Sequence, residues 1–500
     1  MIYVLSLEMK LFKIIFVIIS ILPLFFVGCI QENLSYDSKY HLSFSCDTIV
    51  FDTILINQAS PTKKVRIYNE NKFAINISSI KLASNSNSSF RINVDGCYPS
   101  EDNEIQDIVI KANDSIYVFI ETTISDTSEC RNIVVCDSIL FSYNGNVDKL
   151  QLCAVAKNAI VLNKYILTEN QVWDSKLPYL IFGYVYVPEG VKLKLLPGTQ
   201  LLMHSGANII VDGELNCDGS FESPIIIRGD RFDAVQDVDG TPYFFMPNQW
   251  GGIYLQNPQN SYKFKNVKIY GMSTGIVTLG SSRYFPMLEI FNSVIHTSGN
   301  YGIYSQNADV TINNSEISNC LSGCFVMYGG RCKVVHTTFA NYYRYSARKV
   351  ESFRVNNYVV QNGYKYLFPI DNCVVENSII FGSLQEELKL DLDTNTINNS
   401  NCLFSHTLIK GKRVDNELFY NCRWAKSRNS ELFYDTIFIN TSIEDISKTG
   451  YYNFHLDSAS YARGGAASVV SGKFPLDLDM KSRMQDGYPD MGCYEWSINY

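Results

Sequence analysis

Two different patterns of hydrophobic and polar positions divide the chain. Residues 41–157 alternate apolar and polar positions in short segments such as FRINV (90–94) and SIYVFIETTI (115–124), separated by Asn, Asp, Ser and Gly. A period of two residues is that of a strand with one buried face, and the turn residues mark its ends. About seven such segments in this length predict an antiparallel β-sandwich over residues 41–160.

From residue 178 onward a different signature recurs, in which an Asn or His precedes a short apolar strand. Asn266-Val267-Lys268-Ile269 and Asn292-Ser293-Val294-Ile295 are two copies. The others start at Asn314, His336, Asn377 and His406, so the intervals are 26, 22, 22, 41 and 29 residues. A repeat near 22 residues without helical periodicity predicts one coil of a parallel β-helix per repeat, and the longer intervals predict insertions at corners.

Segments at both ends of this region resemble known proteins. VPEGVKLKLLPGTQLL (187–202) and QWGGIYL (249–255) resemble the opening coils of right-handed β-helix proteins of the pectin-lyase-like superfamily. PLDLDMKSR (475–483) and YPDMGCYEW (488–496) resemble their closing cap, although Met480 stands where Gly is usual and Ser458-Ala459-Ser460 lacks a Pro. The resemblance implies a cap over residues 450–500, held by charge-assisted hydrogen bonds among Asp477, Asp479, Arg483, Asp490 and Glu495.

The sandwich region is similar to the immunoglobulin-like domains that precede solenoids in surface proteins of the Bacteroidetes, through segments such as INISSI (75–80) and ILFSYNG (139–145). The expected fold class is therefore all-β, with an N-terminal immunoglobulin-like β-sandwich over 41–160. A right-handed parallel β-helix solenoid follows over 161–500.

The N-terminal segment predicts export. Basic residues Lys10 and Lys13 precede the apolar run IIFVIISILPLFFVGC (14–29), which is typical of a signal peptide over 1–29. Met9 is a better start for this signal than Met1. Val27-Gly28-Cys29 resembles the bacterial lipobox, which implies a lipid on Cys29 and a place in the cell envelope, at the outer membrane. The polar residues 30–40 would form a tether, and an uncleaved membrane anchor is the alternative.

Composition narrows the choice of partners. The chain has a net charge of −8 and no run of Lys and Arg, so a nucleic-acid partner is not expected. Glu214, Asn216 and Asp218 resemble the start of a calcium loop, but position 12 counted from Glu214 is Ile225 rather than a carboxylate. No metal or other cofactor is therefore predicted. Among the 14 cysteines, Cys130 and Cys136 are close enough in sequence to pair in an oxidising compartment.

The insertion at 341–366 explains the 41-residue interval and supplies the candidate binding residues. Aromatic rings stack on the C–H faces of sugars, and Arg binds carboxylate or sulfate with two parallel hydrogen bonds. The candidates for glycan binding are Tyr342, Tyr343, Arg344, Tyr345, Arg348 and Lys349. The alternative is a lateral loop whose tyrosines cover the side of the solenoid.

The catalytic residues are unknown. Glycoside hydrolysis needs a pair of carboxylates around one bond, and no repeat strand supplies such a pair. His336 and His406 occupy the Asn slot, either as an acid–base pair or as members of a polar ladder at a coil corner. Three functions stay open: a non-catalytic lipoprotein whose β-helix presents loops to a glycan or partner, a polysaccharide lyase or glycoside hydrolase with an unrecognised site, and a structural or adhesive surface protein.

Overall fold

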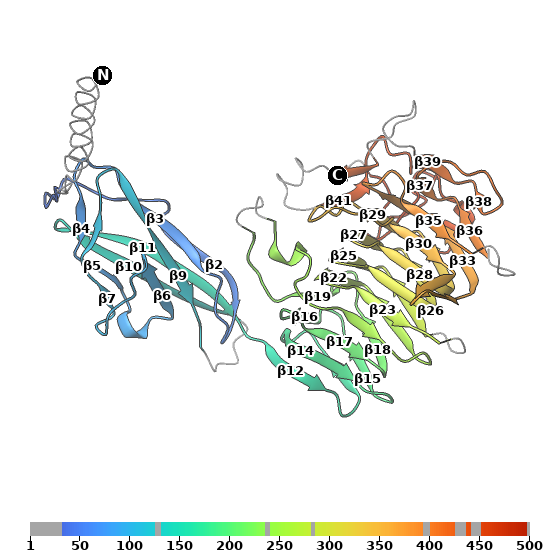
Figure 1. Cartoon of the computed structure of the whole chain (residues 1–500), viewed down its shortest axis with the longest axis horizontal. Helices are drawn as coiled ribbons and strands as arrows, with labels where there is room; N and C mark the ends of the chain where they lie inside the picture. Colours follow the sequence, from blue (N-terminus) through green and yellow to red (C-terminus); the bar gives the residue numbers. More distant parts are fainter. Residues whose placement is uncertain are drawn as a thin grey trace, which may run out of the picture. The chain divides into compact units, whose positions relative to one another are not determined.

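The computed structural model describes residues 33–125, 132–235, 241–281, 286–393, 401–425, 437–441 and 452–497 (Figure 1). The predicted signal peptide, with Met9 and Cys29, lies outside these residues, as does Cys130. In the described part of the chain, no helix is both long and apolar enough to cross a bilayer. The chain divides into two compact units, with the boundary between Ala156 and Lys157.

The first unit is the predicted β-sandwich. One sheet has the order β1 (Ser43–Phe44), β3 (Lys63–Asn69), β9 (Asp114–Thr122) and β6 (Phe90–Val94). The other has the order β2 (Thr48–Leu55), β11 (Asn146–Lys157), β10 (Asn132–Tyr143), β5 (Ser79–Leu82) and β7 (Glu104–Ile105), and β4 (Ile75–Ile77) pairs with β8 (Ile108–Ile110). The apolar side chains that alternate along these strands form one core between the sheets, with Ile67, Val118 and Phe141 fully buried.

Part of the predicted tether belongs to this sandwich. Leu34 forms a β-bridge with Ala74, and the Ser35 N–H donates to the Ala74 carbonyl at 2.9 Å. The Asn146 side chain donates to the Ser38 carbonyl at 2.9 Å. Within the predicted tether over 30–40, these residues therefore have backbone groups that are hydrogen-bonded to the domain.

The second unit is a right-handed parallel β-helix, which confirms the predicted fold class (Figure 1). Three stacks of parallel strands run along it. The first stack contains β17 (Asn208–Val211), β20 (Ile253–Leu255), β23 (Ile276–Leu279), the starts of β26 (Ile303–Asn313) and β28 (Phe325–Val335), β30 (Phe353–Asn356) and β35 (Leu388–Asp391).

The second stack contains β13 (Gln171–Trp173), β15 (Lys192–Leu195), β18 (Glu214–Asp218), β21 (Ser261–Lys265), β24 (Met287–Phe291), the ends of β26 and β28, β33 (Ile370–Glu376), β36 (Cys402–Ser405) and β38 (Phe419–Tyr420). The third contains β16 (Gln200–Met203), β19 (Ile225–Gly229), β22 (Val267–Met272), β25 (Val294–Ser298), β27 (Glu316–Cys320), β29 (Thr338–Asn341), β34 (Ile379–Gly382), β37 (Leu408–Lys410) and β39 (Arg423–Ala425). The long strands β12 (Ile160–Ile166) and β14 (Tyr179–Val187) begin the helix.

The recurring Asn or His is the residue at the corner between the second and third stacks. Its backbone is left-handed in every copy, with φ between 45° and 49° at Asn266, Asn292, Asn314, His336, Asn377 and His406. Asn421, with φ of 50°, adds a copy that the sequence comparison missed. Asn and His adopt this conformation far more readily than β-branched residues, because a short polar side chain can bond locally. The repeat is thus a backbone requirement of the corner.

His336 serves this ladder and is not a proton carrier. Its side chain is fully buried, with Nε2 at 2.9 Å from Ser471 Oγ and 3.0 Å from Asn377 Nδ2. Burial, together with the nearby Arg483, holds the pKa of His336 well below its usual value. The acid–base interpretation is therefore wrong for His336, since no substrate reaches its ring.

The C-terminal segment 452–497 covers the side of the solenoid. Leu478, Met491 and Cys493 pack against Ile379 and Leu408 on the outer face of the third stack, together with β40 (Phe438–Asn440) and β41 (Asn453–Leu456). A short helix α3 (Ser468–Ser471) lies in the same segment. The expected closing cap is thus a lateral cover that runs back towards earlier coils.

The predicted network of acids and one Arg holds this cover together. Arg483 Nη1 lies 3.2 Å from Glu495 Oε1, and the Glu495 N–H donates to Asp477 at 2.8 Å. Asp490 accepts from the Trp496 N–H at 2.8 Å. These bonds satisfy the polar groups that the cover buries, among the residues that the resemblance implied.

Candidate functional site

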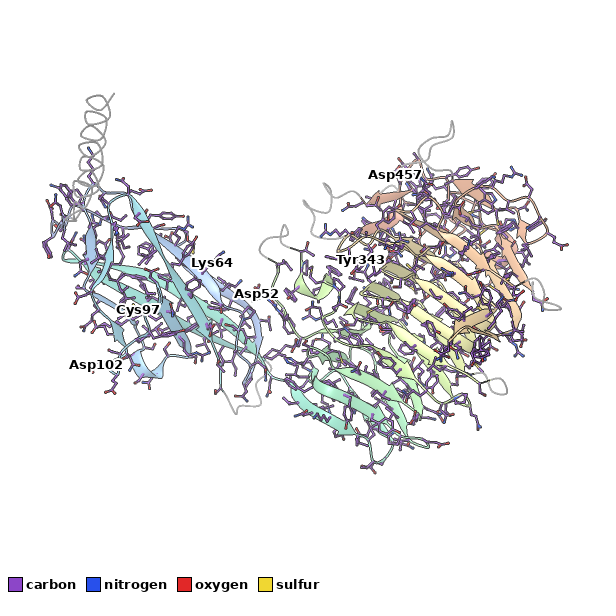
Figure 2. All side chains as sticks on the ribbon, viewed as in Figure 1. Asp52, Lys64, Cys97, Asp102, Tyr343 and Asp457 are labelled. Atoms are coloured by element: carbon purple, nitrogen blue, oxygen red, sulfur yellow. The ribbon has the colours of Figure 1, made fainter. Side chains whose placement is uncertain are left out.

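The insertion at 341–366 separates into two parts with opposite surroundings. Residues 341–350 lie against the wall of the β-helix, where Tyr343 and Arg348 are only 7% and 8% exposed (Figure 2). Tyr342, Arg344 and Tyr345 are half-buried, and of the six predicted glycan-binding residues Lys349 alone is exposed. The second part is the hairpin of β31 (Tyr358–Gln361) and β32 (Tyr364–Leu367), in which Tyr364 is 71% exposed.

Arg348 is an internal ion-pair partner. Its guanidinium donates two parallel hydrogen bonds to Glu387, of 2.9 and 2.7 Å, and the two side chains are 2% and 0% exposed. Glu387 also accepts from the N–H groups of Ser352 and Leu384 at 2.9 and 2.8 Å. Arg348 is therefore not available to a ligand, contrary to the prediction, because a carboxylate from a later coil already occupies it.

The three half-buried members of the predicted set join the insertion to other parts of the wall. Tyr345 donates to the Phe245 carbonyl at 3.3 Å, next to the turn η3 (Tyr243–Phe245). Arg344 donates to Thr241 Oγ1 at 3.3 Å, and the Tyr342 ring stacks on Phe454 at 6.1 Å. The segment 241–250 and the insertion residues 341–350 therefore pack on each other over the third stack, as the lateral-loop alternative predicts.

A second group of half-buried aromatic side chains lies on the outer side of the first stack. Strand alternation turns Ile303 and Ser305 inward and Tyr304 outward, so tyrosines from successive coils meet on the outer side. The ring centroids of Tyr301 and Tyr304 are 5.2 Å apart, and those of Tyr304 and Tyr328 are 5.5 Å apart. We call this surface, with its polar border, the tyrosine face: Tyr301, Tyr304, Tyr328, Arg354, Tyr358 and Asp391.

The polar border of the tyrosine face is fixed by ion pairs and hydrogen bonds. Arg354 on β30 donates to Asp391 on β35 at 2.8 Å and lies 3.6 Å from Glu351. The Tyr358 hydroxyl donates to the second oxygen of Asp391 at 2.9 Å. The Lys365 ammonium lies over the Tyr358 ring, 4.1 Å from its centroid. These contacts hold the polar groups beside the tyrosine rings in one arrangement, which lowers the entropy cost of binding a ligand.

The phenols of Tyr304, Tyr328 and Tyr358 are neutral at physiological pH, because each of them has a raised pKa. Burial raises the pKa of Tyr304 to about 12 and also raises the pKa of Tyr328. The hydrogen bond to Asp391 raises the pKa of Tyr358. Each hydroxyl that is not already bonded can therefore both donate to and accept from a ligand hydroxyl. The tyrosine face combines flat apolar rings with polar groups in the way that sugar rings require.

The sequence does not predict the tyrosine face, because its residues come from different coils and meet only in the folded chain. Tyr301 and Tyr304 in YGIYSQ (301–306) and Tyr328 in FVMY (325–328) look like ordinary strand residues in the sequence. The strand alternation marks Tyr304 as outward-facing. The sequence does not show that the third stack, rather than this side, carries the segment 452–497.

The oxygens of the candidate calcium loop lie in ion pairs along the second stack. Glu214 lies 2.7 Å from Lys192 on the preceding coil, and Asp218 lies 3.7 Å from Lys194 and 3.6 Å from Lys265. Among the described residues, no group of three or more His, Cys, Asp or Glu side chains is close enough to hold a metal ion.

Comparison with known families gives one match within the solenoid. A family described as a right handed beta helix region matches residues 251–384, which include most of the tyrosine face. The central coils are a right-handed β-helix. The match covers the central coils alone and assigns them no substrate. None of the curated protein sequences is significantly similar to this chain.

Solved structures with limited similarity belong to diverse proteins. A family 123 glycoside hydrolase from Clostridium perfringens is 13% identical, over 24% of this chain and 26% of that one, with a TM-score of 0.17. A PapD-like domain of human CEP192 is 9% identical, over 26% of this chain and 92% of that one, with a TM-score of 0.16. The SafA pilin with the SafB chaperone of Salmonella enterica is 12% identical, over 25% and 58%, with a TM-score of 0.17. At these TM-scores, the matches carry no inference about function.

Proposed function

We propose that this chain is an exported protein, anchored by a lipid on Cys29 to the outer membrane, whose β-helix binds a glycan on the tyrosine face without cleaving it. The immunoglobulin-like sandwich would act as a spacer between the anchor and the β-helix. The observation that carries the binding proposal is the cluster of half-buried, outward-facing tyrosines on two successive coils beside the Arg354–Asp391 pair. Support for export comes from the basic and apolar pattern of residues 9–29.

The dimensions of the tyrosine face suit an extended glycan. Coils of a β-helix are spaced by about 4.8 Å, so Tyr304 and Tyr328, which lie diagonally on two successive coils, are close enough together to contact neighbouring sugar rings. Each ring can place its C–H face on a tyrosine while its hydroxyls bond to phenols. At the border, the Arg354 guanidinium, which is bonded to Asn356 and Asp391, has five N–H groups in all, so it would share its remaining donors with ligand hydroxyl or carboxylate groups.

Calorimetry and a glycan array with the full chain test this proposal. Replacing both Tyr304 and Tyr328 with Ala should weaken binding by about tenfold or more, since 1.4 kcal/mol corresponds to a factor of ten. Tyr420 on β38 of the second stack is 60% exposed and gives a matched control, Tyr420→Ala, which should bind normally. Equal affinities of the double variant and the wild type would contradict the proposal, provided both melt at the same temperature.

The polysaccharide lyase or hydrolase hypothesis has one observation in its favour. Asp391 and Glu351 lie on either side of the Arg354 guanidinium, at the edge of the tyrosine face. Incubation with the same glycans, followed by assays for reducing ends and unsaturated products, separates binding from cleavage. Turnover that is lost in Asp391→Asn would show that the tyrosine face is a catalytic site.

The anchoring proposal has its own test. Cells that express the chain with Cys29→Ser should release it from the membrane fraction, whereas wild-type protein should take up a labelled fatty acid and sediment with membranes. If no glycan of the array binds the wild-type protein, the structural or adhesive alternative is favoured.

A further inference from the structure

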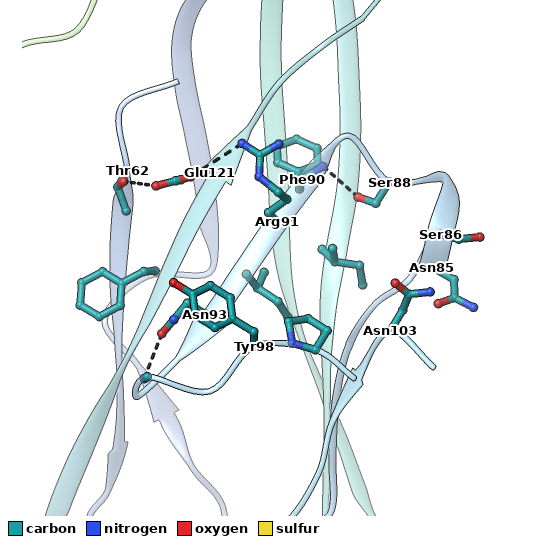
Figure 3. A pocket seen from close by; sticks show the side chains of 15 residues that line it. Thr62, Asn85, Ser86, Ser88, Phe90, Arg91, Asn93, Tyr98, Asn103 and Glu121 are labelled. Atoms are coloured by element: carbon teal, nitrogen blue, oxygen red, sulfur yellow. Dashed lines mark hydrogen bonds and ion pairs between the residues drawn. The ribbon is translucent and has the colours of Figure 1, made fainter. Parts of the chain in front are cut away.

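The β-sandwich contains a cleft of about 740 Å³ along strand β6, separate from the tyrosine face (Figure 3). This volume lies within the range of roughly 300–1,000 Å³ that is typical of small-ligand sites. The residues that line it come from β6, β9, the turn around η2 (Asn85–Asn87) and the loop 95–104. Those used below are Thr62, Asn85, Arg91, Asn93, Tyr98, Asn103, Phe119 and Glu121.

The register of the sheet explains why one side of the cleft has charged, amide and aromatic side chains next to each other. Strand β6 pairs antiparallel with β9, with Arg91 opposite Glu121 and Asn93 opposite Phe119. Side chains at these positions point to the same face of the sheet, because successive residues of a strand alternate. The outer face therefore presents an ion pair, an amide and an aromatic ring side by side.

The other side of the cleft comes from the loop that follows β6. Tyr98 is 75% exposed, and Phe119 is 39% exposed although it lies in the middle of a strand. The loop is held in place because the Val94 N–H donates to the Cys97 carbonyl at 2.9 Å and the Gly96 N–H donates to Asn93 Oδ1 at 2.9 Å. Figure 3 shows Tyr98 beside Asn93, with the Arg91–Glu121 pair above it and the amides of Asn85 and Asn103 to its right.

The charges of the cleft favour an uncharged ligand. Arg91 and Glu121 are the charged residues of the lining, and they lie 3.7 Å apart. Thr62 Oγ1 donates to Glu121 at 2.6 Å, and Arg91 donates to Thr123 Oγ1 at 3.1 Å. The pair therefore has no net charge, and it keeps further N–H donors and oxygen lone pairs for ligand hydroxyls.

The backbone of β6 argues against a peptide strand as the ligand. A peptide that extends a sheet needs free N–H and C=O groups along the edge strand. Near the end of β6, the Val94 N–H and C=O are both bonded to Cys97. At its start, the Phe90 N–H is bonded to Ser88 Oγ at 3.1 Å. Side chains rather than backbone groups dominate this cleft, as expected for a sugar ligand.

We propose that this cleft is a second binding site, for a short neutral oligosaccharide. Tyr98 and Phe119 stack on sugar rings, while Asn85, Asn103 and the Arg91–Glu121 pair bond to their hydroxyls. The site does not depend on the proposed function of the tyrosine face, because it lies in the other unit of the chain. A chain with both sites holds one glycan at two places, or two different glycans.

Calorimetry of the full chain with malto-, cello-, xylo- and manno-oligosaccharides tests the proposal. Tyr98→Ala and Phe119→Ala should each raise the Kd for the bound oligosaccharide by about tenfold or more. Tyr36 in the same unit is also 75% exposed, so Tyr36→Ala is a matched control that should bind normally. The variant with Tyr304→Ala and Tyr328→Ala should keep this affinity, which separates failure of this proposal from failure of the tyrosine face.

Three results of this calorimetry would overturn the proposal. They are the absence of binding to every oligosaccharide of the panel, binding that the Tyr98 and Phe119 variants leave unchanged, and binding that the Tyr304 and Tyr328 variant removes. A fourth arm uses a random peptide library. If peptides bind in a Tyr98-dependent way while no oligosaccharide does, the cleft is a peptide site and the proposal is wrong. Unchanged thermal melting of each variant shows that the substitutions act on the cleft and not on folding.

Discussion

Replacing Arg348 with Met should lower the free energy of unfolding of the β-helix by about 3–5 kcal/mol. The guanidinium supplies two hydrogen bonds of 2.9 and 2.7 Å to Glu387, and both side chains are at most 2% exposed. Without Arg348, the Glu387 carboxylate stays buried with only neutral N–H donors. An uncompensated buried charge is the dominant cost, so Arg348→Met together with Glu387→Leu should recover most of the loss.

The chain provides its own probe for this experiment. All four tryptophans, Trp173, Trp250, Trp424 and Trp496, lie in the β-helix unit, so tryptophan fluorescence during urea or thermal denaturation follows that unit. A loss of 3–5 kcal/mol corresponds to a fall in Tm on the order of 10 °C for a large domain. The sandwich transition, followed by circular dichroism, should not move. A cost below about 1 kcal/mol, with weaker glycan binding, would refute the reasoning and restore Arg348 as a ligand-binding residue.

Asn421→Val should destabilise the β-helix by about 1–2 kcal/mol, and Asn421→Gly much less, because a φ of 50° disfavours a β-branched side chain. Denaturation followed by tryptophan fluorescence compares the two variants, and equal losses of stability would contradict the prediction. Burial raises the pKa of Glu495 to about 8, so the folded state keeps a proton that the unfolded chain has lost. This contribution is full below the unfolded pKa of about 4.5 and disappears as the pH rises through about 8. Glu495→Gln should therefore flatten the decline in Tm across that window, and an unchanged slope would assign it to other groups. Cys136 is hydrogen-bonded to Cys153, so in an oxidising compartment Cys136 should form a disulfide with Cys153 and not with Cys130. Peptide mapping should find this linked pair in protein made under oxidising conditions, and two free thiols would contradict the prediction.

The fold was predictable because its signals are local. Asn266, Asn292 and the residues in step with them mark a left-handed corner, and the preference for that backbone conformation belongs to the single residue. The recurring Asn or His at the corner therefore predicts the register of the coils without any information about contacts between distant residues. The acids and Arg483 of the C-terminal segment also kept the contacts that the resemblance implied.

The candidate site was less predictable because exposure is a long-range property. The sequence around Arg348 predicts a surface residue, whereas in the structure Arg348 donates to Glu387, which lies 39 residues later in the chain. Tyr343 reads as a ligand-binding aromatic, yet the packing of two insertions buries it. Tyr304 is a candidate for ligand binding because it lies on the outer side of the first stack, whereas the third stack is covered by the segment 452–497. These outcomes depend on which side of the coil the insertions and the segment 452–497 occupy.

The lateral position of the segment 452–497 has a consequence for the order in which the protein matures. Tyr494 donates to Glu316 across 178 residues, and the apolar side chains of Ile379 and Leu408 are covered only when this segment arrives. Such a distant contact is slow to form because a long loop must close first. While the chain is being synthesised, the flank of the central coils is therefore exposed. Completion of the fold is tied to delivery of this segment, and chains that stop before it should aggregate.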